Sequence, residues 1–210
     1  LIVLYKNIVN PNIEEIKKIE LYTNKWLREK CQDENYACYL NPLNKIIGGD
    51  GMGFRIWNAN WLSTIYYYLS LIEDRYLTLQ TRDTYLLWAY DTLKWFFSNK
   101  PTYISPEPHM IRKIINELYA RDYNNEAREL EQMMKVTIEN IISQAQEISE
   151  KDREWVMDQN AFIPNSTFLF IEGYKEADVF FEPAVIDLGY SYDPRVQSAF
   201  RIWDDAASGY

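Results

Sequence analysis

The sequence predicts a mainly α-helical protein: a bundle of about five helices, followed by a small β-hairpin or extended C-terminal segment. The first observation behind this prediction is that apolar residues recur every three or four positions over several long stretches, which is typical of amphipathic helices. The second is composition, because 47% apolar and 25% charged residues in a chain of 210 are enough to build a core. The third is a change after residue 159 to short aromatic and β-branched runs.

The N-terminal part of the chain predicts an arm, a helix and a loop. Residues 1–9 have the apolar character of a short strand or extended arm. Asn10 and Pro11 are typical of an N-cap and a first helical position, so an amphipathic helix is expected over about 11–32. Four of the chain's seven glycines fall within 48–53, which predicts a sharply turning loop.

The middle of the chain predicts the core of the bundle. A helix is expected from about 60 to 78, and Thr81 is a suitable cap for the next helix, over about 82–98. Both are apolar on most faces, so we expect them to form an antiparallel hairpin at the centre. A fourth helix is predicted over about 106–121 and a longer one over about 124–150.

The C-terminal part predicts strands. The runs 167–171 and 179–181 are rich in Phe, Ile and Val and are separated by a turn at Gly173, so they are expected to pair as a hairpin. Residues 185–186 would add a further strand. Asp193 followed by Pro194 predicts the start of a short terminal helix.

These elements suggest three segments, and charge is unevenly divided among them. We expect an N-terminal segment over 1–57, a helical core over 58–158 and an acidic, aromatic segment over 159–210. The net charge is −9, and residues 147–210 carry −8 of it, from 13 acidic and 5 basic side chains. No run of Lys and Arg is present to neutralise phosphates, so we expect no direct contact with nucleic acid.

Cysteine and hydropathy patterns bear on location. Cys31 and Cys38 are the only cysteines, and their spacing does not match a metal site, so two reduced structural thiols in a reducing compartment are expected. The longest apolar-rich stretch, 85–97, is interrupted by Asp91 and Lys94 and is too short to span a bilayer. We therefore expect a soluble protein without a membrane span, either intracellular or associated with a virion.

No motif predicts a catalytic, cofactor-binding or metal-binding residue. His109, the one histidine, has no nucleophile elbow near it in the sequence. The glycines of 48–53 lack the strand and lysine of a phosphate-binding loop, and Asp50 would repel phosphate. The chain is therefore more readily explained without an enzymatic activity, although this question stays open.

Four acidic residues leave an enzymatic alternative open. They fall on or beside the two central helices: Glu73, Asp74, Asp83 and Asp91. Two acids facing a cleft are the requirement of glycosidase chemistry. Arg75 and Arg82 lie next to them in the sequence, so ion pairs are the other explanation.

Candidate interaction residues come from two places. Apolar residues of the long helix recur at nearly heptad spacing, which predicts either ordinary packing in the bundle or a seam that contacts another subunit. The C-terminal segment adds aromatic residues that would suit docking on a neighbour. The candidates are Leu130, Met134, Ile138, Ile141, Phe180, Phe181 and Trp203.

Three functional hypotheses follow. The first is a structural or adaptor subunit of a larger assembly, such as a virion or a phage head-to-tail connector, whose partners are protein subunits of the same or another kind. It is favoured by abundant Tyr and Trp and by the acidic C-terminal segment. The second is a small helical carbohydrate-active enzyme that uses paired carboxylates. The third is an acidic regulatory module that mimics nucleic acid.

Overall fold

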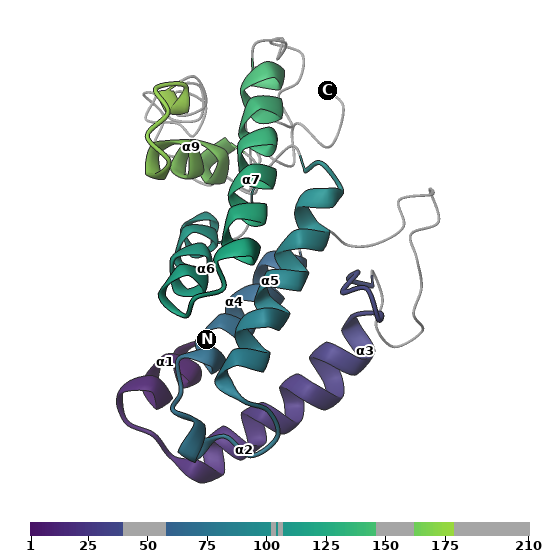
Figure 1. The fold of residues 1–210 in the computed structure, drawn as a ribbon, viewed down its shortest axis with the longest axis vertical. Helices are drawn as coiled ribbons and strands as arrows, with labels where there is room; N and C mark the ends of the chain where they lie inside the picture. The colour runs from purple at the N-terminus through teal and green to yellow at the C-terminus, as the bar shows by residue number, and fades with distance from the viewer. Residues whose placement is uncertain (40–57, 102–103, 105–106, 146–161, 179–210) are drawn as a thin grey trace, which may run out of the picture. The chain divides into compact units, whose positions relative to one another are not determined.

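The described part of the protein is mainly α-helical, as the sequence predicts (Figure 1). The computed structural model describes residues 1–39, 58–101, 104, 107–145 and 162–178. Within these residues no strand occurs, and the β-type pairing is a single antiparallel bridge between Gln32 and Cys38.

The chain divides into two compact units. The first contains residues 1–99 and 110–133, and the second contains residues 100–109 together with those from 134 onward. Both α6 (Pro108–Ala120) and α7 (Asn124–Ala145) contribute residues to each unit. The division at residues 57 and 158 that the sequence suggests stays a prediction.

The first nine residues form a helix, so the expected strand or arm is wrong. Helix α1 spans Ile2–Val9 and buries Leu4 and Asn7. The Asn7 amide donates to the Val3 carbonyl at 2.8 Å and to the Glu15 carboxylate at 2.9 Å. This burial at helical spacing shows that packing outweighs the strand preference of β-branched residues.

The second helical stretch runs from residue 13 to 31, close to the predicted range (Figure 1). It comprises α2 (Ile13–Tyr22), a π-helical segment η1 (Thr23–Arg28) and α3 (Glu29–Cys31). The predicted cap at Asn10 is wrong: Asn12 caps the helix by accepting from the amides of Glu14 and Glu15. Asn12 is held at this cap position by a further hydrogen bond, in which its backbone amide donates to the Asn7 side-chain oxygen at 2.7 Å.

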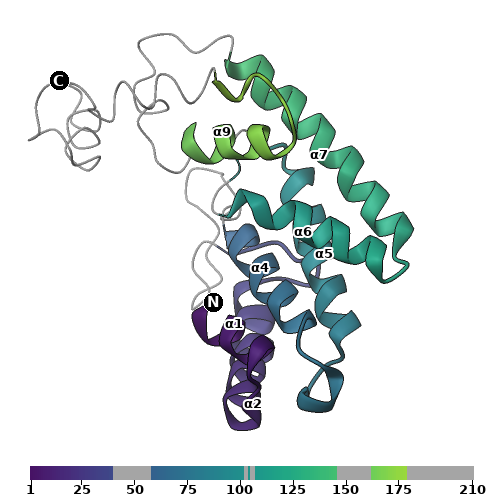
Figure 2. The ribbon, with the colours of Figure 1, turned by 90° about the vertical axis from the view of Figure 1, so that its left-hand side faces the viewer.

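The predicted hairpin at the centre is present. Helices α4 (Asn58–Ser70) and α5 (Arg82–Ser98) lie side by side (Figures 1 and 2), and Thr81 caps α5. Helix α4 ends at Ser70, earlier than expected, and a short 3₁₀ helix η2 follows (Asp74–Tyr76). The Ser70 carbonyl accepts from Arg82 at 3.0 Å and from Arg121 at 2.7 Å, which satisfies a terminal carbonyl of α4.

The predicted fourth and fifth helices are α6 and α7. A tight turn joins them, with Asp122 in the left-handed region at φ 63° and a bond from the Tyr123 amide to the Leu118 carbonyl. This pattern is a Schellman-type helix end.

The predicted strand 167–171 is wrong, because these residues belong to helix α9 (Phe162–Ile171). Asn165, Phe168 and Leu169 are buried at the three- and four-residue spacing of a helical face. Gly173 is not a hairpin turn: it has φ +80° and ends α9, where the Tyr174 amide bonds to the Leu169 carbonyl at 2.9 Å.

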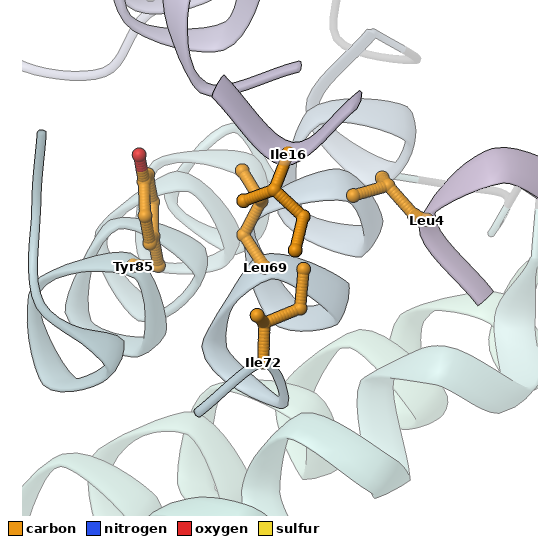
Figure 3. Close-up of a cluster of buried hydrophobic side chains, with 5 residues drawn as sticks. All are labelled: Leu4, Ile16, Leu69, Ile72 and Tyr85. Carbon is orange, nitrogen blue, oxygen red and sulfur yellow. The ribbon is translucent and has the colours of Figure 1, made fainter. Parts of the chain in front are cut away.

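A cluster of five buried side chains joins α1, α2, α4 and α5 (Figure 3). The cluster contains Leu4, Ile16, Leu69, Ile72 and Tyr85. Leu4 and Ile16 bring the two N-terminal helices onto the central hairpin. The first unit therefore has a core to which the N-terminal residues contribute directly.

Several sequence predictions lie outside the described residues. They concern the glycine loop 48–53, the strands 179–181 and 185–186, and the terminal helix after Asp193. Among the residues that are described, no helix combines the length and the apolar character needed to cross a bilayer.

Candidate functional site

Large apolar side chains are exposed on the two N-terminal helices. We refer to seven of these exposed side chains together as the apolar surface: Ile2, Val3, Tyr5, Val9, Ile13, Leu21 and Tyr22. The exposed fraction reaches 87% at Ile2, 73% at Val9 and 62% at Tyr5. Helix α1 produces this surface because it is apolar on nearly every side, so only one side can face the core.

A groove of about 300 Å³ opens at the apolar surface. Its walls come from α1, α2, η1 and α4, and are almost entirely apolar. The lining residues are Leu1, Val3, Leu4, Lys18, Ile19, Tyr22, Thr23, Leu27 and Ile65. The volume is at the lower end of the range for ligand sites and suits one or two large side chains.

Lys18 is the one charged side chain that lines the groove, and several other charged residues of α1 and α2 are paired. Lys6 contacts Glu15 at 2.7 Å, and Lys17 contacts Glu14 at 3.1 Å. The hydrogen bond from Lys6 holds the pKa of Glu15 below its ordinary value. Lys18 is exposed and, within the described residues, makes no ion pair or hydrogen bond. The groove thus has one positive charge at its edge, which makes no direct ion pair but helps to lower the pKa of Glu15 through a weaker electrostatic interaction.

A second cluster lies where η1 and the loop after α3 meet α5. The Arg28 guanidinium stands 4.0 Å from the centre of the Tyr36 ring and donates to the Asp33 carbonyl at 2.7 Å. Burial raises the pKa of Asp91, and the Tyr36 hydroxyl beside it opposes this shift. The pKa of Tyr36 is also raised, again mainly by burial. Asp91 is therefore a half-buried carboxyl with an increased tendency to hold its proton.

A carboxylate with the opposite tendency lies near Asp91. Lys94 contacts Glu129 at 2.8 Å, and the Tyr90 hydroxyl donates to the same carboxylate. The lysine lowers the pKa of Glu129, with a smaller contribution from Tyr90. This arrangement keeps Glu129 ionised, while Asp91 protonates more easily.

Behind this cluster is a buried polar network around Gln32. The Gln32 amide donates to the Tyr36 carbonyl at 2.9 Å and to the Thr92 hydroxyl at 3.1 Å. Its oxygen accepts from the Tyr66 hydroxyl at 2.7 Å. Cys31 and Cys38 are buried free thiols beside it, and burial raises the pKa of both. Thiols of this kind are unreactive, which matches the structural role expected for them.

The other acids considered for catalysis have structural partners. Glu73 pairs with Arg75 at 2.9 Å, and Asp83 pairs with Arg121 at 3.2 Å. Asp74 accepts from the backbone amide of Arg82 at 2.8 Å. The contacts of Glu73 and Asp83 correspond to the ion-pair explanation. His109 lies on the surface, 3.6 Å from Glu107.

The four candidate residues on α7 are buried. Leu130, Met134, Ile138 and Ile141 are each no more than 2% exposed. Their burial corresponds to the alternative in which the stripe packs within the bundle, and a role for them in subunit contact stays a prediction. Phe180, Phe181 and Trp203 lie outside the described residues.

The apolar surface is a feature that the sequence patterns considered above do not predict. The signal was the run Leu1 to Tyr5, in which every residue is apolar and which continues with Ile8 and Val9. Read as a strand, this run would alternate its faces. Read as a helix, it exposes some apolar side chains wherever the core lies.

In the part of the chain that is described, no group of three His, Cys, Asp or Glu side chains could hold a metal ion.

Comparison with known proteins gives no match: no protein-family model, curated protein or solved structure resembles the chain.

Proposed function

We propose that this protein is a structural or adaptor subunit that assembles with further copies of itself through the apolar surface of α1 and α2. The observation that carries the proposal is the exposure of Ile2, Tyr5 and Val9 on one short helix. Neighbouring large apolar side chains in water cost free energy that association recovers, and such patches mark contact sites.

The composition of the apolar surface also supports a protein partner. Tyr5 and Tyr22 belong to it, and tyrosine is enriched in the centres of interfaces. The same two helices also carry the exposed ion pairs Lys6–Glu15 and Lys17–Glu14. An apolar centre with a polar rim is the usual composition of an interface.

The mass of the full chain in solution tests the proposal. We expect light scattering to give a multiple of the chain mass for the unmodified protein. The double variant Ile2→Ser with Tyr5→Ser should have the mass of one chain, since about 25 cal/mol per Å² of apolar burial is lost. Both side chains are exposed, so the urea midpoint should hardly change.

A matched control is available on another helix. Phe170 of α9 is 77% exposed and does not belong to the apolar surface. The variant Phe170→Ser should retain the oligomeric mass. An unmodified chain that stays a monomer up to several hundred micromolar, or a Phe170→Ser variant that dissociates as fully as the double variant, would contradict the proposal.

Carboxylate chemistry is a second candidate, favoured by one observation. The pKa of Asp91 is raised and that of the nearby Glu129 is lowered. Opposite shifts of two neighbouring acids are the pattern of an acid paired with an ionised group in glycosidases. We would measure release of reducing sugar from a panel of soluble glycans. Turnover that Asp91→Asn abolishes would favour the enzyme over the adaptor.

A further inference from the structure

We propose that the groove between α1 and α2 receives residues 179–188 of a second copy of this chain. This inference rests on the proposed self-assembly and adds to it the identity of the docking segment. It begins from two features of the first unit: an apolar groove of about 300 Å³ and Lys18 at the groove's edge.

The charge around the groove selects an acidic occupant. Lys18 is the one charged side chain among the residues that line the groove, and it is positive. Of the four acids in residues 1–31, Glu20 is buried and accepts hydrogen bonds, and the other three each pair with a lysine. Lys18 lacks such a partner among the described residues, so a carboxylate from outside would complete its environment.

The sequence of the C-terminal segment has the complementary chemistry. Residues 147–210 carry a net charge of −8. Within them, 179–188 combine large apolar side chains with Glu182 and Asp187 and contain no basic residue. Glu182 directly follows Phe180 and Phe181, so a phenyl ring in the groove would bring a carboxylate within reach of Lys18.

The docking segment consists of the first ten residues that follow Asp178 in the sequence. Two copies that exchange their segments form a closed pair with two identical contacts, which is the isologous arrangement that most homodimers use. Each contact then contains one groove, one segment and one Lys18–Glu182 pair.

A charge-exchange experiment on the full chain tests the inference. Lys18→Glu and Glu182→Lys, each alone, should weaken the dimer by about tenfold at low salt, because both contacts become repulsive. An equimolar mixture of the two variants should recover the unmodified affinity. In the mixed dimer, the glutamate introduced in one copy meets the lysine introduced in the other at one contact, and the unmodified Lys18 meets the unmodified Glu182 at the second. Both pairs are again attractive.

Matched controls separate this effect from general charge effects. Lys17→Glu changes the neighbouring lysine, which does not line the groove, and Asp178→Lys changes an exposed acid outside the segment. Neither should respond to mixing. Val3→Trp should block the groove and leave a monomer, whereas Val136→Trp, at an exposed position of α7 outside both the groove and the apolar surface, should not.

The outcomes distinguish the inference from the proposed function. If the unmodified chain is a monomer, the proposed self-assembly fails. If the chain associates and the apolar-surface variant dissociates it, but mixing restores nothing, the apolar surface is the interface and the segment is not its occupant. Retained dimerisation of Val3→Trp would likewise overturn the groove as the docking site. Recovery on mixing supports exchange between copies, because contact within one chain cannot respond to mixing.

Discussion

The Glu20 carboxylate accepts a hydrogen bond from the Tyr85 hydroxyl at 2.9 Å, in a place where neither side chain is exposed to solvent. The same carboxylate accepts from the amide of Thr78 at 2.6 Å, from the Thr78 hydroxyl at 2.9 Å and from the amide of Leu79 at 3.2 Å. Glu20 thus fixes the segment before α5 to α2 by accepting hydrogen bonds from it.

Glu20→Gln should lower the free energy of unfolding by about 3 kcal/mol, because an amide nitrogen would face backbone amides that need an acceptor. Tyr85→Phe should cost about 1–2 kcal/mol, since it removes the donor to Glu20 and the acceptor for the Asn24 amide. Urea unfolding at pH 7 measures both. Glu14→Gln is the control, because Glu14 is exposed and should change stability by less than about 0.5 kcal/mol. Equal effects of the two glutamate variants would contradict this role of Glu20.

Asn7→Asp should destabilise the protein more at pH 7 than at pH 4. Asn7 is buried and donates 2.9 Å to the Glu15 carboxylate, so an aspartate there would set two negative charges against each other. The expected loss at pH 7 is about 2–3 kcal/mol. Thermal unfolding at the two pH values measures it. Asn125→Asp is the control, because Asn125 is exposed and accepts from Arg128. A loss that is the same at both pH values would count against the contact.

Asp91→Asn should become more stable relative to the unmodified protein as the pH rises. Burial raises the pKa of Asp91 in the folded state, so the fold binds this proton more tightly than the unfolded chain. The stabilisation from the bound proton is complete below the ordinary aspartate pKa of about 4 and is lost as the pH rises through the folded pKa. Asparagine undergoes no such loss. Urea unfolding of both proteins from pH 4 to 7 should show the difference growing, and a constant difference would refute the shift.

The two thiols should react slowly in the native protein. Cys31 and Cys38 are buried and their pKa values are raised, so little thiolate is present or accessible. A thiol-reactive dye at pH 8 should label neither within minutes, and both within seconds in 8 M urea. Cys38 should be slower than Cys31, because it is the more fully buried of the two. Rapid labelling without urea would mean that the loop after α3 opens readily.

The helices at the centre of the chain were predictable because their sequences show a helical period with clear boundaries. Thr81 caps α5 as expected, since a hydroxyl before a polar first turn is a local signal. Helices α1 and α9 were not predictable in the same way. Their short apolar runs suit either a strand or a helix, and burial of Leu4 and Asn7, or of Phe168 and Leu169, decides between the two.

The candidate sites depend on contacts between distant residues. The seven residues of the apolar surface are all visible in the sequence, but which side of α1 faces the core follows from the packing of Leu4 against α2 and α4. Asp91 was identified as one carboxylate of several. Its pKa is raised by burial, at a place where the loop after α3 returns and brings Tyr36 beside α5. A local sequence pattern does not predict which distant segment of the chain folds back against a helix.

The π-helical segment from Thr23 to Arg28 sets the phase of everything that follows it in the same helix. A π turn accommodates one more residue than an α turn, so it behaves as a single-residue insertion that the helix has absorbed. Deleting one residue there would leave a regular α-helix but rotate Arg28 and Gln32 by about 100° relative to Ile16 and Glu20. The two halves of this helix could then no longer both meet the core, so the chain should tolerate substitutions in this turn far better than a change in its length.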